Sequence, residues 1–369
     1  MTEMILAEPA LADRIVGRLA DAGPTSAASE LADAVTQVGG RGEPILVTGC
    51  GTSEHAAQAV AAILAEGLAA TIADGSSSPR SAQAFELSLE APTRGLVIAI
   101  SHEGGTAMTL AALAGARAGG ARTATITASR RSPAGAAADI VVETAELDQS
   151  WCHTVGYLSP IVAATAVAAR IRDQPVDGAL GRALRTLLAA GLDQTATIEA
   201  IAAVLAGLDR VLVIASGADR PAGRELVLKI EEGTWIPAAY RDLETLLHGH
   251  LAATDGSTGV VLILTDRDHS AERASRARGV LAAARIIGMP VAAILSEAIA
   301  GTIAPDLTPA GRIVVPDAPD LPRFVAASLC TATALQTLTE RLARARGVDP
   351  DAIHRDVDRY REAAKAAES

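Results

Sequence analysis

The sequence predicts an α/β protein made of two doubly wound, flavodoxin-like parallel-sheet domains in tandem. Continuous runs of Val, Ile and Leu alternate with alanine-rich helical segments in both halves of the 369-residue chain. This alternation is typical of parallel sheets that are covered by helices on both faces. Hydrophobic residues make up 49% of the chain but aromatic residues only 2%. Small aliphatic side chains must therefore fill the cores, and the helices must lie close to the sheets.

The strand and helix pattern occurs twice. Residues 44–65 predict a buried strand, a Gly/Ser/Thr loop and a helix, and residues 95–129 predict strand, loop, helix and strand. Residues 209–233 and 259–296 repeat this order in the second half. Because the order of elements repeats, we expect two similar domains.

Glycines mark matching positions in the two halves. Gly51 and Gly217 stand in corresponding loops, and Gly95 and Gly259 precede corresponding strands. In doubly wound sheets, ligands bind where the strands end, so these loops are the candidate binding regions.

We expect four parts along the chain. An N-terminal segment (1–35) packs on the core, and a first domain (36–190) carries the ligand loops. A second domain (191–345) supplies a Glu and a His to the site, and the tail (346–369) is a surface segment or frayed helix. Turn residues at 173–178 precede the domain boundary.

Charge and composition exclude several classes of protein. A net charge of −11 argues against binding to nucleic acid, whose phosphates require basic surface. The three cysteines cannot form a disulfide framework, and none lies in a CxxC pair. The N-terminus lacks the pattern of a signal peptide, and no apolar run is long enough for a membrane span. We expect a cytoplasmic protein without membrane partners, and no cofactor is predicted.

The two halves differ where their strands end. The first half places GCGTS (49–53) and SHEGGT (101–106) there, rich in glycine and hydroxyl groups. Together with the start of the following helix, such loops favour an anion. The second half has the more acidic ASGAD (215–219) and TDRDH (265–269). The ligand pocket is thus predicted in the first half. Glycine and hydroxyl residues are also common in ordinary turns and helix caps, which would explain either of the first-half loops by itself. That explanation accounts less well for two such loops at neighbouring strand ends.

Glu232 and His248 are candidates for acid–base chemistry. Glu232 ends a helix whose inner face is marked by Leu226, Val227 and Ile230, and His248 follows an apolar pair. A Glu at a helix end is more often solvated, and a lone His more often structural, so spacing alone favours catalysis weakly.

Two other combinations are discounted. His248 and His250 suggest a metal only weakly, because no third ligand is near, so no metal site is predicted. Cys152 and His153 are neighbours in sequence and point apart on a strand or helix, so they are not expected to form a nucleophile–base pair.

Several separate segments together resemble the tandem sugar isomerase (SIS) domain family, including the isomerase half of glutamine–fructose-6-phosphate aminotransferase and related deglycases and deaminases. The resemblance covers nearly all of the chain. The segments are MILAEP (4–9), GCGTS (49–53), SHEGGT (101–106), LDQSWCHTV (147–155), ELVLKIEEG (225–233) and LLHGHLAATDG (246–256).

This resemblance implies roles for individual residues. Glu232 is the base that moves a proton between C1 and C2, and His248 opens the sugar ring. It also implies a homodimer in which the histidine loop comes from the partner subunit. Ser53, Ser101 and Thr106 surround the ligand's phosphate, and Thr52 lies close to the sugar. The full set of expected ligand-binding residues is Gly51, Thr52, Ser53, Ser101, His102, Glu103, Gly104, Thr106 and Trp151.

Departures from the family narrow the function. The chain starts at the isomerase half, so we do not expect glutamine-dependent amination. The tail has Arg355 and Asp356 but no Lys where the synthase forms an imine, and Lys365 comes only later. Trp151 and His153 replace smaller residues.

The leading hypothesis is an aldose–ketose isomerase, or a deaminase or deglycase of ketosamines, that works through an enediol or enol. The alternative is a non-catalytic sugar-binding or regulatory protein, but the acidic N-terminus supplies no basic DNA-binding helices. A catalytically dead partner subunit is expected to lack Glu232 or His248, and both are present.

Glu103 conflicts with a bound phosphate. At about 4 Å and an effective dielectric of 20, the repulsion from a phosphate dianion would be roughly 8 kcal/mol. Three arrangements avoid the conflict. Glu103 turns away, to solvent beside the helix dipole or toward Arg130 or Arg131; it is neutralised by His102 or a proton; or the ligand presents a hydroxyl or ammonium group there. The last is slightly favoured, because His102 and Gly105 also depart from the family in this loop.

Overall fold

The computed structural model describes residues 1–21, 26–71 and 77–367. Within these residues, ten strands form two sheets of five, and neighbouring strands pair in parallel. The first sheet contains β1 (Ile45–Gly49), β2 (Arg80–Gln83), β3 (Leu96–Ile100), β4 (Arg122–Thr127) and β5 (Ile140–Glu143). The second contains β6 (Arg210–Ala215), β7 (Ala238–Arg241), β8 (Thr258–Leu264), β9 (Val291–Ser296) and β10 (Gly311–Val315).

Both sheets have the same strand order. The first runs β2-β1-β3-β4-β5, and the second, read from its other edge, runs β7-β6-β8-β9-β10. This is the flavodoxin-like order, in which the chain starts inside the sheet and winds outward in both directions. The predicted fold class, two doubly wound domains in tandem, is confirmed.

Helices cover both faces of the first sheet. One face packs against α2 (Ala27–Gly40), α3 (Thr52–Ala69) and α7 (Val155–Ile171). The other face packs against α4 (Ala84–Leu89), α5 (Ala107–Gly119) and α6 (Pro133–Ala137). Strands buried on both faces need side chains that are apolar throughout, which explains the continuous aliphatic runs of β1 and β3.

The second sheet is covered in the same way. Its inner face packs against α9 (Thr195–Leu205), α10 (Arg220–Thr234) and α13 (Arg323–Ala345). Its outer face packs against α11 (Ser270–Ile287) and α12 (Glu297–Ala300). The short 3₁₀ helices are η1 (Gly217–Asp219), η2 (Thr245–Leu247), η3 (His250–Ala253) and η4 (Pro305–Leu307).

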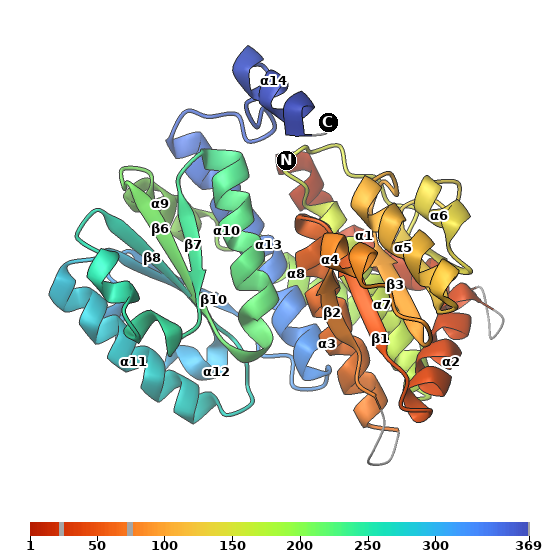
Figure 1. Ribbon diagram of the computed structural model, residues 1–369. Coiled ribbons are helices and arrows are strands. Elements are labelled where there is room, and N and C mark those ends of the chain that lie inside the picture. The colour runs from red at the N-terminus through yellow and green to blue at the C-terminus, as the bar shows by residue number, and fades with distance from the viewer. Residues whose placement is uncertain (22–25, 72–76, 368–369) are drawn as a thin grey trace.

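The two domains share one layer of helices. Helices α10 and α13 of the second domain contact α3 of the first, so a single apolar core continues between the sheets (Figure 1). Glu66 on α3 accepts hydrogen bonds from the N–H groups of Arg323 (2.8 Å) and Phe324 (3.0 Å), which caps the start of α13. The two domains are therefore held in a fixed arrangement by the helices between their sheets.

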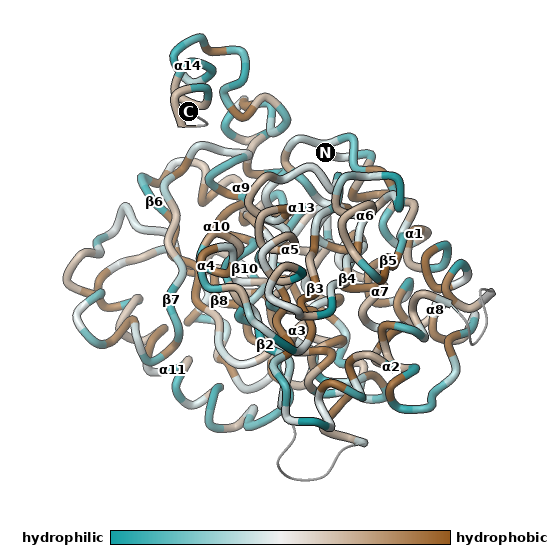
Figure 2. The backbone as a smooth tube through the Cα atoms, turned by 45° about the vertical axis from the view of Figure 1, so that its right-hand side comes forward, coloured by the Kyte–Doolittle hydropathy of each residue, from teal (hydrophilic) through white to brown (hydrophobic). Residues whose placement is uncertain are grey.

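The remaining helices lie at the ends of the chain and between the domains. Helix α1 (Thr2–Asp21) packs on α7, α8 (Gly178–Leu192) and α13. The proposed boundary at 35/36 falls inside α2, and that at 190/191 falls inside α8. In the tail, the exposed and hydrophilic α14 (Asp358–Ala367) stands apart from the body (Figure 2).

Within the described residues, no single helix is long and apolar enough to span a membrane. The bent pair α8 and α9 would be long and apolar enough together, by length and composition alone.

Candidate active site

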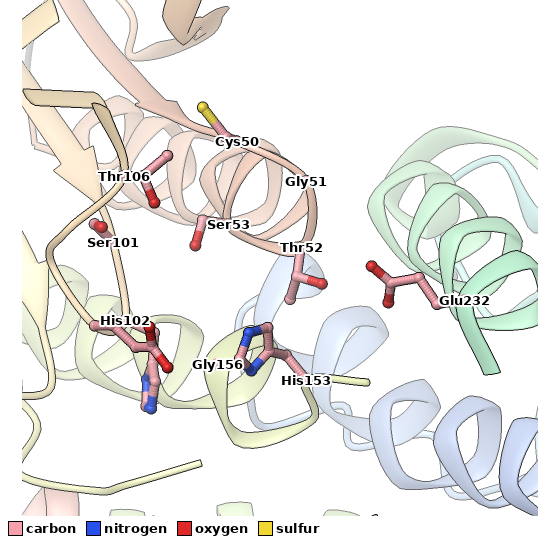
Figure 3. A pocket seen from close by; sticks show the side chains of 11 residues that line it. Cys50, Gly51, Thr52, Ser53, Ser101, His102, Thr106, His153, Gly156 and Glu232 are labelled. Carbon is pink, nitrogen blue, oxygen red and sulfur yellow. The ribbon is translucent and has the colours of Figure 1, made fainter. Parts of the chain in front are cut away.

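A cavity of about 310 Å³ opens where strands β1 and β3 end. Its walls come from the loops after these strands, the start of α7 and the last turn of α10, so both domains contribute (Figure 3). The lining residues are Cys50, Gly51, Thr52, Ser53, Ser101, His102, Glu103, Thr106, His153, Gly156 and Glu232. The structure thus brings together eight of the eleven predicted site residues.

One side of the cavity is built from hydroxyl groups. Ser53, Ser101 and Thr106 cluster there in Figure 3, and among the described residues none of their hydroxyls is hydrogen-bonded to protein. Helix α5 begins behind Thr106, and α3 begins behind Gly51 without a side-chain cap. Free hydroxyls beside two helix N-termini suit an anionic group or several sugar hydroxyls.

Glu232 projects into the cavity from the opposite side, toward Thr52 (Figure 3). Its Oε2 accepts a hydrogen bond from Lys229 Nζ at 2.7 Å, and its side chain is 29% exposed. Since Lys229 occupies one carboxylate oxygen, the other remains available to a ligand.

A buried charge network holds Glu232. Lys229 is fully buried, and its Nζ also lies 3.6 Å from Glu225 Oε1. Glu225 Oε2 in turn lies 2.8 Å from His55 Nδ1 on α3. Burial by itself lowers the pKa of Lys229, but the nearby charges of Glu225 and Glu232 outweigh it and the net shift is upward. Lys229 therefore remains an ammonium group that fixes the Glu232 carboxylate.

The sequence analysis did not predict this network. A signal was present, because Glu225 and Lys229 share the helix face of Leu226 and Ile230. Charged residues on an apolar face must be paired with each other or with a ligand.

Cys152 lies beside this network and is chemically inert. It is buried, with Sγ 3.9 Å from Glu232 Oε2. Burial raises the pKa of its thiol to about 12, so a thiolate is not formed at neutral pH. The geometry agrees with discounting a Cys152–His153 nucleophile pair.

His153 was not expected to line the site. Asp148 Oδ2 accepts the N–H groups of Thr154 (2.8 Å) and Gly156 (2.9 Å), and it lies 3.6 Å from His153 Nδ1. The neighbouring Asp148 carboxylate is the main cause of a raised pKa at His153. Cys50 and Gly156 also line the cavity without having been predicted. The sequence did contain a signal for His153, because this side chain is larger than the residue that the family has at the same position.

His102 is the most enclosed histidine of the cavity. It is 9% exposed, and neither ring nitrogen has a hydrogen-bond partner in the described residues. Burial lowers its pKa, so the ring is neutral at neutral pH. It consequently does not neutralise Glu103.

Glu103 lines the cavity and makes no side-chain hydrogen bond or ion pair with the described part of the chain. Arg130, one of its two expected partners, instead pairs with Glu143, through its N–H at 2.9 Å and its Nε at 3.5 Å. Arg131 donates its backbone N–H to Ser129 and has no side-chain pair among these residues. Neither expected arginine contacts Glu103, which is exposed.

Three predicted residues lie outside the cavity lining. His248 is 70% exposed, and its Nε2 lies 2.7 Å from Glu244 Oε1, because η2 turns it toward the outer helix α11. Trp151 is 47% exposed, and the Arg355 guanidinium covers its ring at 3.3 Å.

Gly104 is the third, and its role is structural. Its φ is +73°, and a Cβ there would lie 2.2 Å from Ser132 Oγ. The loop after β3 therefore requires glycine at this position for its own path.

Fold and site together define a protein of two doubly wound domains with one ligand cavity between them. Residues 42–169 match the family model described as the SIS domain. The first domain is a SIS domain, and the chain as a whole has the fold of tandem SIS proteins, as the resemblance predicted. A comparison with curated protein sequences gives no match.

Solved structures share the architecture at low sequence identity. The C-terminal domain of glucosamine-fructose-6-phosphate aminotransferase from Francisella tularensis aligns with a TM-score of 0.80 and 19% identity, covering 95% of this chain and 97% of that one. Tagatose-6-phosphate ketose/aldose isomerase from Escherichia coli gives 0.73 and 18%, covering 95% and 94%. Glucosamine-6-phosphate deaminase from Thermotoga maritima gives 0.62 and 16%, covering 88% and 95%. The fold is thus one that isomerases and deaminases of sugar phosphates share.

Proposed function

We propose that this protein is an enzyme that isomerises, deaminates or deglycates a sugar derivative through an enediol or enol intermediate. One observation carries the proposal. The carboxylate of Glu232, which is held by the buried Lys229, faces free hydroxyls of the first domain across one cavity. The solved structures with this fold include isomerases and a deaminase of sugar phosphates, which supports the same class of reaction.

Glu232 acts as the base. It takes a proton from the carbon next to the substrate carbonyl, and the carbon–hydrogen electrons form the enediol double bond. Returning the proton to the neighbouring carbon completes an isomerisation. In a ketosamine or amino sugar, returning the proton to the neighbouring carbon converts the enaminol into an imine instead; water adds to the imine carbon, and the amine leaves with a proton as the carbonyl forms. Lys229 holds the carboxylate in place in both cases.

Glu103 sets the substrate class. Its unpaired charge beside the hydroxyl loops favours a ligand that presents a hydroxyl or ammonium group there, and it opposes a phosphate. We therefore place unphosphorylated sugars and amino sugars ahead of their phosphates as substrates.

Stability under ligand tests the substrate class. A ligand that binds only the folded protein raises its melting temperature. Glucose, fructose, glucosamine, fructosyl-glycine and the 6-phosphates of the first three form the panel. Ligands that raise the melting temperature are then incubated in D₂O, and deuterium uptake next to the carbonyl is followed by NMR. Binding without proton exchange or product would support a non-catalytic sugar-binding protein instead.

A homodimer is also part of the proposal, because a role for His248 in this cavity requires that a second protomer supply it. Sedimentation of the protein in dilute solution is expected to give a dimer. An active monomer would contradict a shared site.

A further inference from the structure

We infer that His153, oriented by Asp148, is the acid–base residue that opens the sugar ring, and that it acts in the same chain as Glu232. The inference rests on the proposed function and assigns a second catalytic residue to it. The role was expected of His248, which the structure places on the outside of its own protomer.

The position of His153 fits the task. Its ring projects into the cavity between the hydroxyl side and Glu232 (Figure 3). Nδ1 is buried and faces Asp148, whereas the side chain as a whole is 30% exposed. With Nδ1 turned to a carboxylate, Nε2 is the nitrogen presented to a ligand.

Asp148 is itself firmly held. Its oxygens accept N–H groups from Ser150 (3.0 Å), Thr154 (2.8 Å) and Gly156 (2.9 Å). Burial raises the pKa of Asp148, but the nearby His153 ring and these N–H groups outweigh that effect and the pKa is lowered. A fixed carboxylate behind an imidazole orients the ring and stabilises its charged form, the arrangement that serves acid–base histidines in other enzymes.

The step balances without a further reactant. The His153 imidazolium gives its Nε2 proton to the ring oxygen as the bond between the anomeric carbon and that oxygen breaks. The anomeric hydroxyl then loses its proton to Nε2 while its oxygen forms the carbonyl. The imidazolium is restored, and the open sugar is ready for Glu232.

Other charged groups also act on His153. Asp148 and Glu103 favour its imidazolium, and Lys229 opposes it, while His102 lies with its ring centroid 6.5 Å away. The negative groups prevail, Asp148 above all, so the pKa of His153 is raised and the acid form extends to higher pH than for a free histidine.

The test separates ring opening from proton abstraction. Fructose and fructosyl-glycine form rings, whereas erythrulose, a four-carbon ketose, is too short to close one. Deuterium uptake next to the carbonyl is measured by NMR for wild type, His153→Gln, His248→Gln and Glu232→Gln. We expect His153→Gln to slow exchange in the cyclic probes at least about tenfold, in the range usual for loss of an acid–base group. Exchange in erythrulose should change less than about threefold.

The variants serve as each other's controls. Glu232→Gln should lose exchange with every probe, since it removes the base that both reactions need. Equal losses with cyclic and open-chain probes in His153→Gln, or no loss, would overturn the inference. A loss confined to the cyclic probes in His248→Gln would assign ring opening to the partner subunit instead. If the wild type exchanges no proton with any probe, the proposed function fails, and this inference fails with it.

Asp148→Asn supplies a readout that a structural role would not move. Without the carboxylate the pKa of His153 falls, so the imidazolium disappears at lower pH. The rate with cyclic probes should then decline at a lower pH than in wild type, while the profile with erythrulose keeps its position. Parallel profiles for both kinds of probe would contradict the role of the pair.

Discussion

The two domains have the same fold but use the ends of their strands differently. In the first, Gly51 follows β1 with a φ of +56°, and the nearest atom to a Cβ there is 4.0 Å away. In the second, Gly217 follows β6 with a φ of +61°, but a Cβ would lie 2.1 Å from Asp266 Oδ2. The loop has the same shape in both domains. In one it borders an open cavity, and in the other a carboxylate of the chain occupies the space.

This carboxylate does internally what a ligand would do in the first domain. Asp266 accepts the N–H of Ala218 at 2.8 Å and pairs with Arg323 and Arg273 at 2.6 Å and 3.1 Å. Beside it, Asp219 accepts the N–H of Thr265 at 2.8 Å, and burial raises its pKa to about 6. The acidic residues seen in the sequence close the second loop, whereas the first remains free for substrate.

A second cavity of about 310 Å³ does exist near the ends of β8, β9 and β10. Half of its ten lining residues are alanine or proline, and the arginines on it are already bound within the protein. Arg267 donates to the carbonyl groups of Ala318 and Leu321, and Arg323 pairs with Asp266. The fold thus forms a cavity near the strand ends of both domains. We expect chemistry only in the first-domain cavity, because its polar groups are free to contact a ligand.

The largest expected effect tests whether the open cavity is a reaction site. Glu232→Gln keeps the shape and hydrogen bonding of the side chain but removes the base. Turnover should fall at least about a hundredfold, while ligand binding, measured by calorimetry, stays nearly unchanged. Activity within a factor of two of wild type would remove Glu232 from the mechanism.

The next effect concerns stability in the closed loop. Asp266→Asn deprives Arg323 and Arg273 of a buried carboxylate and should lower the free energy of unfolding by about 2–3 kcal/mol. Ser101→Ala, in the open loop, is the matched control and should change it by less than about 0.5 kcal/mol, because its hydroxyl bonds to no described protein group. Urea unfolding of both variants measures the difference. Equal effects would contradict the contrast between the two loops.

The pH dependence sharpens the same test. Burial raises the pKa of Asp266, but the bonds from Arg323 and from the N–H groups of Ala218 and Asp268 outweigh this, and the net shift is downward. A lowered pKa gives stability that is present above the ordinary Asp range and is lost as the pH falls through the folded value. The gap between wild type and Asp266→Asn should therefore shrink in acid.

A smaller effect tests selection by charge. Glu103→Ser should weaken binding of the ligand identified in the panel and tighten binding of fructose 6-phosphate and glucosamine 6-phosphate by about tenfold, since a repulsive charge beside the phosphate is removed. Glu297→Ser, an exposed carboxylate at the start of α12, controls for net charge. If the wild type already binds these phosphates at micromolar concentration and Glu103→Ser changes this less than about threefold, Glu103 does not select the ligand.

The sequence predicted the central strands well and the edges poorly. Strands such as β3 and β8 carry an uninterrupted aliphatic run, which only a doubly covered sheet requires. The edge strands β2 and β7, with the sequences RSAQ and AAYR, are short and partly exposed and give no such pattern. Their existence follows from neighbouring strands and not from their own residues.

Sequence reasoning predicted the site residues correctly where the chain keeps the family pattern, and it missed residues where the chain departs from that pattern. The hydroxyl loops and Glu232 lie together as expected. His153 and the pairing of Glu225 with Lys229 depend on which way side chains face across two domains, and local spacing does not contain that information. Catalytic roles for Glu232 and His248 remain predictions.

The shared helical layer has a consequence for anyone who divides the protein. The match to the SIS domain ends at residue 169, yet helices α3 and α7 of that segment pack against α10 and α13. A fragment cut at this boundary would expose the aliphatic surface of α3 and α7 to water and lose Glu232 from the cavity. The segment that sequence comparison identifies as one domain is therefore only part of a single packed unit.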